Sequence, residues 1–428
     1  MLLRLSAGAR SARLPAAAGL VLYGLAATAA PLTLEEAWRI AEQANPALRA
    51  AQSELFAARG RLAEARAPLF NNPAISLEGA RVRYPAQMPG ERTRDWRAGV
   101  SLSQTFELAG QPRRRREAAA AELEAVGASL AETRAQVRAE VERRFVQVLA
   151  RQLRSELERQ TVSIVERAAA AMAERLDAGE ASRLDANLAR VESERARNQL
   201  VQLDEQLTLA RSELAGLLQL PPGELPPVQG ELRREAPYTL EGLLEAASRR
   251  PQLEALARRE DAARSRLELE RAARYPDVTV GLLTSREGGP DFVNAVGLSV
   301  ALPLPLFRRN EAGIGRAMTE LAQVEVERQA AGRDAAAGVR AQWQRVSQLE
   351  TRARGLREAV LRTLEENQRL SASALKEGEI GIAELLLVNR QVAEVRRELL
   401  DVETELRQAR VELERSAGWP PLDSREAR

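Results

Sequence analysis

The sequence predicts a mainly α-helical fold with a small β part. Duplicated long-helix coiled-coil hairpins are expected to form a trimeric α-barrel, joined to a transmembrane β-barrel with four strands per protomer. Three observations lead to this prediction. The chain contains an internal duplication at an offset of roughly 200 residues. Each copy holds a long apolar stripe with coiled-coil spacing. Each copy also holds two stretches in which apolar and polar residues alternate, which is the pattern of strands.

The first segment, 1–30, has the layout of a secretory signal peptide. Three arginines precede an apolar stretch, and Ala27-Thr28-Ala29 is a small-x-small cleavage site. Removing these arginines takes the formal charge of the chain from +2 to −1, so the basic pI does not indicate nucleic-acid binding. No later run of 18 apolar residues is present, so no membrane-spanning helix is expected, and any span must be made of strands.

The duplication sets the domain boundaries. "LTLEEAWRIAEQANPALRAAQSEL" from Leu32 is answered by "YTLEGLLEAASRRPQLEALARRED" from Tyr238, and "SELAGLLQLPP" from Ser212 by "VELERSAGWPP" from Val411. The first structural repeat is therefore expected at 31–219 and the second at 238–428. The proline-rich segment 220–237 is expected to link them.

Each repeat is expected to begin with two short helices. Thr33 or Thr239 caps the first, and Pro46 or Pro251 opens the second. A long helix follows the strands, and Arg113 to Asp177 would measure about 97 Å. The shorter helices 46–67 and 182–217 together reach roughly 87 Å. One long helix therefore matches two shorter ones laid end to end.

Alternating residues place the strands at about 74–84 and 96–108 in the first repeat, and at about 277–285 and 292–304 in the second. Four strands cannot close a barrel, and open strand edges are not tolerated in lipid. Two copies would give eight strands around an interior filled by side chains. Three copies would give a wider, water-filled barrel, so a homotrimer is expected.

A Gly-Glu turn ends the long helix of each repeat, at Gly179-Glu180 and at Gly378-Glu379. An acid stands six residues beyond each glycine, namely Asp185 and Glu384. Both features have an ordinary explanation, because glycine often ends helices and acids favour the first turn of a helix. Because the turn occurs in both repeats, an interaction role for the glycines is favoured. For the two acids both interpretations stay open.

No chemistry of catalysis is apparent. The chain has no histidine and no cysteine, which excludes catalytic triads, thiol catalysis, disulfides and the commonest transition-metal sites. No phosphate-binding glycine loop follows a strand. The arginine run from Arg113 to Arg116 is interpreted as a solvated helix start rather than an anion site. We therefore expect no enzyme, no cofactor, no metal site and no nucleic-acid partner.

The layout and the repeat marks resemble the outer membrane efflux proteins of the TolC family, over essentially the whole mature chain. "SLSQTFELAGQPRRRREAA" from Ser101 and "FNNPAISLEG" before it resemble the CzcC-type components of heavy-metal efflux systems. The usual Gly-Gly-Lys-Arg of those components is here Ala109-Gly110-Gln111-Pro112.

The resemblance implies a passive exit duct in the outer membrane that extends into the periplasm. Its partners would be outer membrane lipid, a periplasmic adaptor (membrane fusion) protein and an inner-membrane pump of the resistance-nodulation-division (RND) class. The cargo would be heavy-metal cations, which the chain would pass without binding them tightly. Two alternatives stay open: a duct for drugs or other organic compounds, and a periplasmic coiled-coil adaptor or scaffold without a membrane span.

For the tips, the resemblance implies that Gly179, Glu180, Gly378 and Glu379 meet the adaptor. The gate aspartate of the family's first tip corresponds to Asp185, and Glu384 follows from repeat symmetry. The arginine and tyrosine that latch the second tip in TolC correspond to Ile380 and Leu375, so that latch is absent here.

Overall fold

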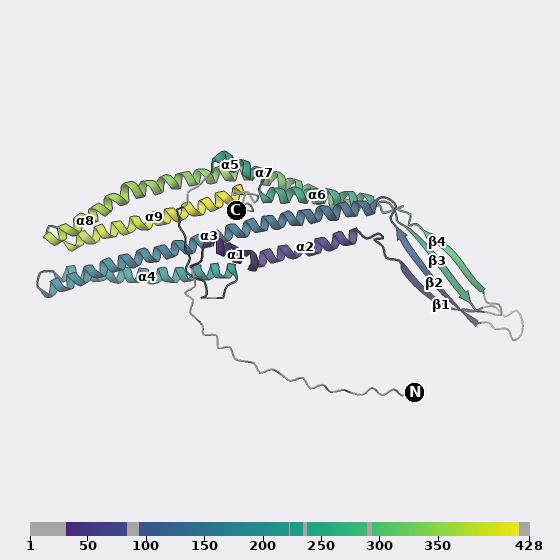
Figure 1. Ribbon diagram of the computed structural model, residues 1–428, viewed down its shortest axis with the longest axis horizontal. Helices are drawn as coiled ribbons and strands as arrows, with labels where there is room; N and C mark the ends of the chain where they lie inside the picture. Colours follow the sequence, from purple (N-terminus) through teal and green to yellow (C-terminus); the bar gives the residue numbers. More distant parts are fainter. Residues whose placement is uncertain (1–30, 84–93, 222, 234–237, 289–292, 419–428) are drawn as a thin grey trace, which may run out of the picture.

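The computed structural model describes residues 31–83, 94–221, 223–233, 238–288 and 293–418. The expected signal peptide at 1–30 lies outside these residues. The described chain is an elongated layer of helices with a strand sheet at one end (Figure 1). The helices and strands of the first repeat are α1 (Leu34–Ala44), α2 (Pro46–Ala65), β1 (Ala74–Arg83), β2 (Arg94–Phe106), α3 (Gln111–Asp177) and α4 (Arg183–Leu218).

The second repeat has the same order: α5 (Leu240–Ser248), α6 (Pro251–Ala272), β3 (Val278–Glu287), β4 (Val293–Ala301), α7 (Glu311–Gly355), a π-helical turn η1 (Leu356–Leu361), α8 (Arg362–Glu377) and α9 (Ile382–Ala417). The helices α4 and α9 each have 36 residues. The α3 helix has 67 residues, and α7, η1 and α8, with 45, 6 and 16, cover the same length. The structure therefore shows the duplication element by element.

Local sequence explains where the short helices begin. The Thr33 side chain accepts a hydrogen bond from the backbone N–H of Glu36, and the Glu36 carboxylate accepts one from the backbone N–H of Thr33. These two reciprocal bonds form a capping box at the start of α1. The N–H and hydroxyl of Thr33 lower the pKa of Glu36. Thr239 caps α5 in the same way through the backbone N–H of Gly242. Pro46 and Pro251 open α2 and α6, where the missing N–H costs nothing.

The helices form four parallel rows, in the order α2 with α4, then α3, then α6 with α9, then α7 with η1 and α8. In two of the rows, shorter helices meet end to end. Asn45, at the start of α2, donates from Nδ2 to the carbonyl of Leu217 near the end of α4 (3.4 Å). In the second repeat, Arg250 before α6 donates from Nη1 to the carbonyl of Ser416 in α9 (3.3 Å). These bonds satisfy carbonyls that a helix end leaves without a partner.

The core lies between the rows at mid-length, one apolar cluster per repeat. The cluster of the first repeat includes Val141, Phe145 and Leu214, and that of the second includes Val339 and Leu413. Buried ion pairs cross from α3 to α9 between the two repeats. Glu142 pairs with Arg407, and Glu158 pairs with Arg397. Because an unpaired buried charge is costly, these pairs fix how the two repeats align.

The described part of the expected linker, 220–221 and 223–233, is packed against the first repeat. Leu225, Val228 and Leu232 are buried in the first core cluster. Val228 forms a parallel bridge with Leu32, and Gln152 of α3 donates from Nε2 to the carbonyl of Val228 (3.0 Å). The prolines of this segment remove N–H donors without preventing burial of the apolar side chains between them, so proline content alone does not reveal the docking.

The long helix of the second repeat differs from its counterpart, because η1 interrupts it whereas α3 is continuous. Around this point Ala353 is buried and Leu356, Arg357 and Leu361 are half-buried. A π turn holds more residues than an α turn, so it keeps these positions on the inner side of the row. Repeat symmetry did not indicate this interruption.

Candidate functional site

Both tip turns have the same backbone geometry. Gly179 has φ +78° and Gly378 has φ +79°, in the left-handed region where glycine carries no steric penalty. The N–H of Glu180 binds the carbonyl of Arg175, and the N–H of Glu379 binds the carbonyl of Ala374, at 2.8 and 2.9 Å. This bond pattern is a Schellman motif, which ends each long helix at its glycine. The two turns lie at the end of the molecule opposite the strands (Figure 1).

The structure places the two gate candidates in the first turns of the returning helices. Asp185 is half-buried in α4, and its carboxylate accepts from the hydroxyl of Ser182 (2.6 Å), whose oxygen in turn accepts from the N–H of Asp185 (3.1 Å). Glu384 is exposed in the first turn of α9, where Gly381 supplies no side-chain cap. Among the described hydrogen bonds, none joins Asp185 to Glu384. Asp185 thus serves as a helix-start acid, a role that leaves a gating role open.

An apolar cluster joins the two tips within one chain. Met172, Ala189, Ile382 and Leu386 are buried together, and Leu375 packs against them. Leu375, where the resemblance to TolC implies that a latch tyrosine is missing, contributes packing here. The sequence analysis did not find this cluster, since it joins residues roughly 200 positions apart. The only local signal is that apolar side chains follow the second glycine directly.

Behind this cluster, a cavity of about 370 Å³ is lined by α3, α4, α8 and α9. Three of its four lining arginines, Arg390, Arg396 and Arg397, have acidic partners on neighbouring helices. Arg390 donates from Nη2 to Oε1 of Glu192 (2.6 Å), which ties α9 to α4. Arg397 donates from Nη2 to Oε2 of Glu158 (2.6 Å), which ties α9 to α3. This cavity behind the apolar cluster is therefore polar, with its charges compensated.

At the other end, the four strands form one antiparallel sheet in the order β1-β2-β3-β4. The register forms rows of neighbouring residues across the strands. One row contains Leu77, Val100, Thr284 and Val296, and the row two residues further along contains Ile75, Leu102, Leu282 and Leu298. This face is apolar and exposed. It comprises Ile75, Leu77, Trp96, Val100, Leu102, Phe106, Val280, Leu282, Val296, Leu298 and Val300.

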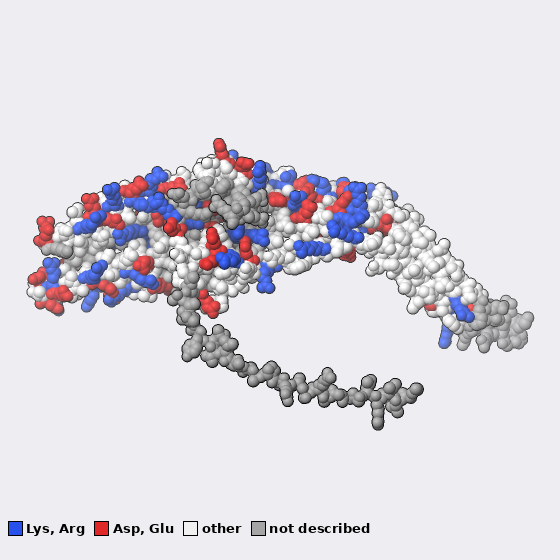
Figure 2. Space-filling model, in the orientation of Figure 1, with Lys and Arg blue, Asp and Glu red and all other residues white. Residues whose placement is uncertain are grey.

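The opposite face of the sheet carries small and polar residues. Most of this face consists of Ser76, Glu78, Arg97, Gly99, Ser101, Ser103, Thr105, Thr279, Gly281, Ser285, Glu287, Ala295, Gly297, Ser299 and Ala301, and its larger apolar side chains are Val82, Leu283 and Val293. Arg97 forms an ion pair with Glu287 across the sheet. The space-filling view shows a strand region almost free of charged residues beside strongly charged helices (Figure 2). The sheet is thus suited to an apolar medium on one face and water on the other.

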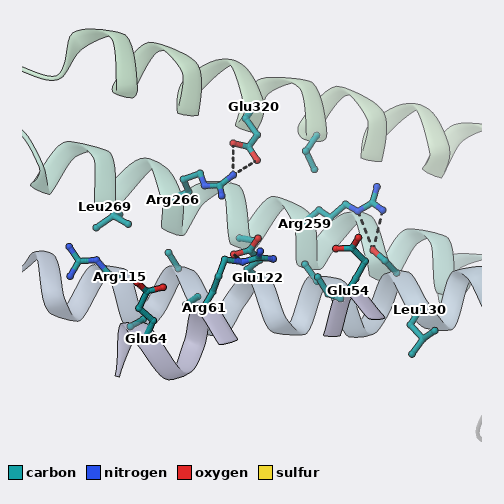
Figure 3. A pocket seen from close by; sticks show the side chains of 18 of the residues that line it. Glu54, Arg61, Glu64, Arg115, Glu122, Leu130, Arg259, Arg266, Leu269 and Glu320 are labelled. Carbon is teal, nitrogen blue, oxygen red and sulfur yellow. Dashed lines mark hydrogen bonds and ion pairs between the residues drawn. The ribbon is translucent and has the colours of Figure 1, made fainter. Parts of the chain in front are cut away.

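Where the helices approach the strands, a cavity of about 580 Å³ is lined by all four rows, through α2, α3, α6 and α7. Figure 3 shows its charged lining. Arg61 pairs with Glu122 (3.1 Å) and Arg266 pairs with Glu320 (3.1 Å), each bond joining adjacent rows. The lining helices are neighbours in a single layer. The cavity is therefore an open hollow on the surface of this helix layer rather than an enclosed pocket. Its lining is of mixed charge.

The arginine run at the start of α3 does not form a free cationic surface. Arg113 and Arg114 pair with Glu117, and Arg115 pairs with Glu107 and lies 3.5 Å from the ring centroid of Phe70. Arg116 donates from Nε to the carbonyl of Pro112 (3.1 Å). A solvated helix start would leave the Arg115 side chain exposed, but only 18% of it is exposed. The turn at Gly110 brings this side chain against Glu107, just after β2.

In the described part of the chain, no helix has an apolar stretch of the length that a membrane span requires. The same residues hold no group of three or more acidic, histidine or cysteine side chains placed to bind a metal ion.

Known proteins resemble this chain in sequence and in fold. The cobalt-zinc-cadmium resistance protein CzcC of Cupriavidus metallidurans is 29% identical over 304 residues, which are 70% of this chain and 69% of that protein. The outer membrane protein VceC of Vibrio cholerae superposes with a TM-score of 0.73 at 16% identity, covering 90% of this chain and 96% of that one. The channel CusC gives a TM-score of 0.71 at 18% identity, covering 90% and 92%.

These structural matches confirm the mainly helical fold with a four-stranded sheet that the sequence predicts. The family model for outer membrane efflux proteins matches residues 38–218 and 243–419, which span both repeats. The chain therefore belongs to the outer membrane efflux protein family, as its resemblance to TolC implied.

Proposed function

We propose that three copies of this chain close head to tail into one hollow duct, with a barrel of strands in the outer membrane and a tube of helices in the periplasm. The observation that carries this proposal is the arrangement of the edges. β1 and the row of α2 and α4 form one edge of the chain, and β4 and the row of α7, η1 and α8 form the other. A head-to-tail contact that closes after three copies pairs β4 of each copy with β1 of the next.

Exposed apolar side chains support the same closure. On the helices, the large apolar side chains that are exposed in one chain gather in the two edge rows. They are Phe56, Leu184, Leu188, Val191, Val201 and Leu209 on one edge, and Met318, Val326, Val360 and Leu370 on the other. Within the described part of the chain, the inner rows contribute only Leu153 and Leu387. Contact between neighbouring copies would remove such surface from water.

The two faces of the sheet support a membrane barrel with a wet interior. Strands of such barrels alternate apolar residues toward lipid with polar residues toward the lumen. The apolar face that includes Leu102 and Leu298 would meet lipid, and the face that includes Ser101 and Ser299 would line the lumen. Backbone groups at the outer edges of β1 and β4 would otherwise lack partners in lipid, where each unmet group is costly.

The partners follow from family membership and from the position of the tips. Gly179, Glu180, Gly378 and Glu379 lie at the end farthest from the sheet, and there they would meet a periplasmic adaptor protein. The adaptor would connect the duct to an inner-membrane RND transporter. Asp185 and Glu384 would ring the narrowing just inside these turns and act as its gate.

The cargo we propose is heavy-metal cations, and the similarity to a cobalt-zinc-cadmium resistance protein supports this class. The helices carry side chains of both signs that compensate each other in ion pairs such as Arg61 with Glu122. A hydrated cation would find no excess of negative charge there to bind it. A wall of such helices would let cations pass without holding them. The chain would then act as a passive conduit, with selection made in the pump.

The test is growth of the host with the gene deleted and restored. We expect deletion to increase sensitivity to Co²⁺, Zn²⁺ and Cd²⁺, and restoration of the gene to reverse it. Sensitivity to organic dyes and drugs alone would favour the duct for organic compounds and would contradict the metal cargo. The control is a chain with Leu77→Asp and Val296→Asp, which put a charge on the apolar face of the two edge strands, β1 and β4. We expect this variant not to assemble and therefore not to restore resistance.

A further inference from the structure

We infer that the periplasmic end of the sheet carries a binding surface for anionic phospholipid headgroups, formed by an apolar rim and two arginines. The rim consists of Tyr275, Leu302, Leu304, Leu306 and Phe307, and the arginines are Arg274 and Arg308. This inference concerns the lipid around the protein, and it depends on the outer membrane location alone, not on the cargo or the pump.

The rim continues the apolar face of β4 beyond its last ladder residue. In β4, Val296, Leu298 and Val300 lie on that face, and Leu302 and Leu304 prolong the same spacing of two. The side chains after the strand are strongly exposed, with Leu304 at 69%, Leu306 at 67% and Phe307 at 95%. Apolar side chains in this position extend the lipid-facing band to its boundary with water.

The segments that enter β3 and leave β4 lie next to each other. The ladder between the two strands ends at the pair Thr279 and Ala301, so the residues before one and after the other leave the sheet side by side. The Asn310 side chain donates to the backbone and to the carboxylate of Glu270, at 2.9 and 2.6 Å. This contact holds the start of α7 against the end of α6, and Arg308 and Arg274 each lie within four residues of it along the chain.

The arginines of this rim differ from the arginines of the α3 start. In the described part of the chain, neither Arg274 nor Arg308 forms a direct ion pair, and both are exposed. Arg274 has Glu311 as a charged neighbour: the backbone N–H groups of Arg309 and Glu311 lower the pKa of that carboxyl, and the charge of Arg274 lowers it further. Arg309, which follows Arg308, holds the turn instead, donating from Nε to the carbonyl of Pro305 (3.3 Å). By contrast, Arg113, Arg114 and Arg115 pair with glutamates. Two guanidinium groups thus remain available to an anion from outside.

Position and chemistry together identify the anion. An apolar band that ends in Tyr275 and Phe307 and is followed at once by arginines matches the boundary of a bilayer, where acyl chains give way to phosphates. A lipid satisfies both halves of the surface, because its chains cover the rim and its phosphate accepts from the guanidinium groups. Figure 2 shows that the charged residues of both signs end where the helices adjoin the uncharged strand region.

The experiment is native mass spectrometry of the full-length protein in detergent, titrated with phosphatidylglycerol or with phosphatidylcholine of the same acyl chains. We expect the wild type to bind phosphatidylglycerol more tightly. Each arginine removed should weaken that binding about fivefold, so Arg274→Gln with Arg308→Gln should weaken it about 25-fold. The matched control is Arg183→Gln with Arg190→Gln, two exposed arginines of α4 near the tips that should leave lipid binding unchanged.

Three results would overturn the inference. Equal phosphatidylglycerol binding by the wild type and the Arg274/Arg308 variant would show that these arginines contact no lipid phosphate. Displacement of the lipid by an equal concentration of inorganic phosphate would indicate a site for a free anion. Loss of the oligomer in this variant with either lipid would place the rim in a contact between subunits.

Discussion

The carboxylate of Glu158 in α3 is completely buried and accepts hydrogen bonds from both Nε and Nη2 of Arg397 in α9, the latter at 2.6 Å. The two residues belong to different repeats, so this pair joins the halves of the molecule. Arg154 lies one turn before Glu158, with its Nε 3.8 Å from the same carboxylate. A buried charge with two guanidinium neighbours is expected to be sensitive to the loss of either partner.

Replacing Glu158 by Gln should destabilise the protein by about 2–3 kcal/mol, because the half-buried Arg397 is left charged without its counterion, which costs less than leaving a fully buried charge. Unfolding in denaturant, followed by circular dichroism, measures this. The variant Glu158→Met with Arg397→Met should recover most of the loss. As a surface control, Glu245→Gln removes a highly exposed pair with Arg249 and should change stability by about 0.5 kcal/mol or less. Equal effects of the two Gln variants would contradict a special role for the buried pair.

Gly378→Pro and Gly179→Pro should abolish efflux while the oligomer still assembles. Proline is confined to φ near −65° and cannot adopt the positive φ of either turn. The sheet lies about 100 Å away along the 67-residue α3 and should be unaffected. Heat-modifiable migration of the oligomer on gels reports assembly, and metal resistance of the cells reports efflux.

The control for these turns is Gly338→Ala, within α7, where an added methyl group meets no atom within 4 Å and φ is helical. It should stabilise the helix by about 0.5–1 kcal/mol and leave efflux intact. Loss of the oligomer in both proline variants would show that the turns are needed for folding rather than for contact with a partner.

Asp185→Asn with Glu384→Gln should reduce the cation selectivity of the pore and its block by trivalent cations. Three copies of each acid would gather up to six carboxylates around one narrowing, and such a ring concentrates cations. The effect should be larger at low salt, because ions screen exposed charges at high salt. Single-channel recordings across a salt gradient give the reversal potential. Unchanged selectivity and block would leave the two acids with their helix-start role alone.

Leu298→Arg should destabilise the membrane-inserted protein by about 2–4 kcal/mol, because it puts a charge on the lipid side near the middle of β4. Ala295→Arg changes the opposite face of the same strand and should have little effect if that face is wet. Urea unfolding from vesicles compares the two. A larger cost for Ala295→Arg would mean that the two faces of the sheet have been assigned the wrong way round.

The sequence of this chain predicts those features in which one face of a strand or helix is apolar and the other polar. It does not predict contacts between residues that lie far apart in the sequence. The alternation of β2 and β4 is clear, since each strand has an apolar face and a polar face. In β1 the outward positions change from Ile75 and Leu77 to Gly79 and Arg81 toward the loop, so its pattern fades. β4 ends at Ala301 rather than near 304, because Pro303 lacks an N–H for the ladder although the apolar spacing continues.

The contacts at the tips show the limit more sharply. Gly179 and Gly378 are found from local sequence alone, because a positive φ favours glycine. The cluster of Met172 and Leu386 and the pair of Glu192 with Arg390 depend on how the two repeats align, which no local pattern encodes. The sequence also does not predict the π turn at Leu356–Leu361. This turn changes the backbone hydrogen bonds but not the number of residues in the long helix.

The most direct test of the proposed duct is the molar mass of the detergent-extracted outer membrane protein, measured by light scattering with the detergent contribution subtracted. Closure of four-stranded sheets through the free edges of β1 and β4 predicts a mass of three chains that falls to one chain after heating. A stable particle of one chain or two chains, or recovery of the protein only from the soluble periplasmic fraction, would contradict it.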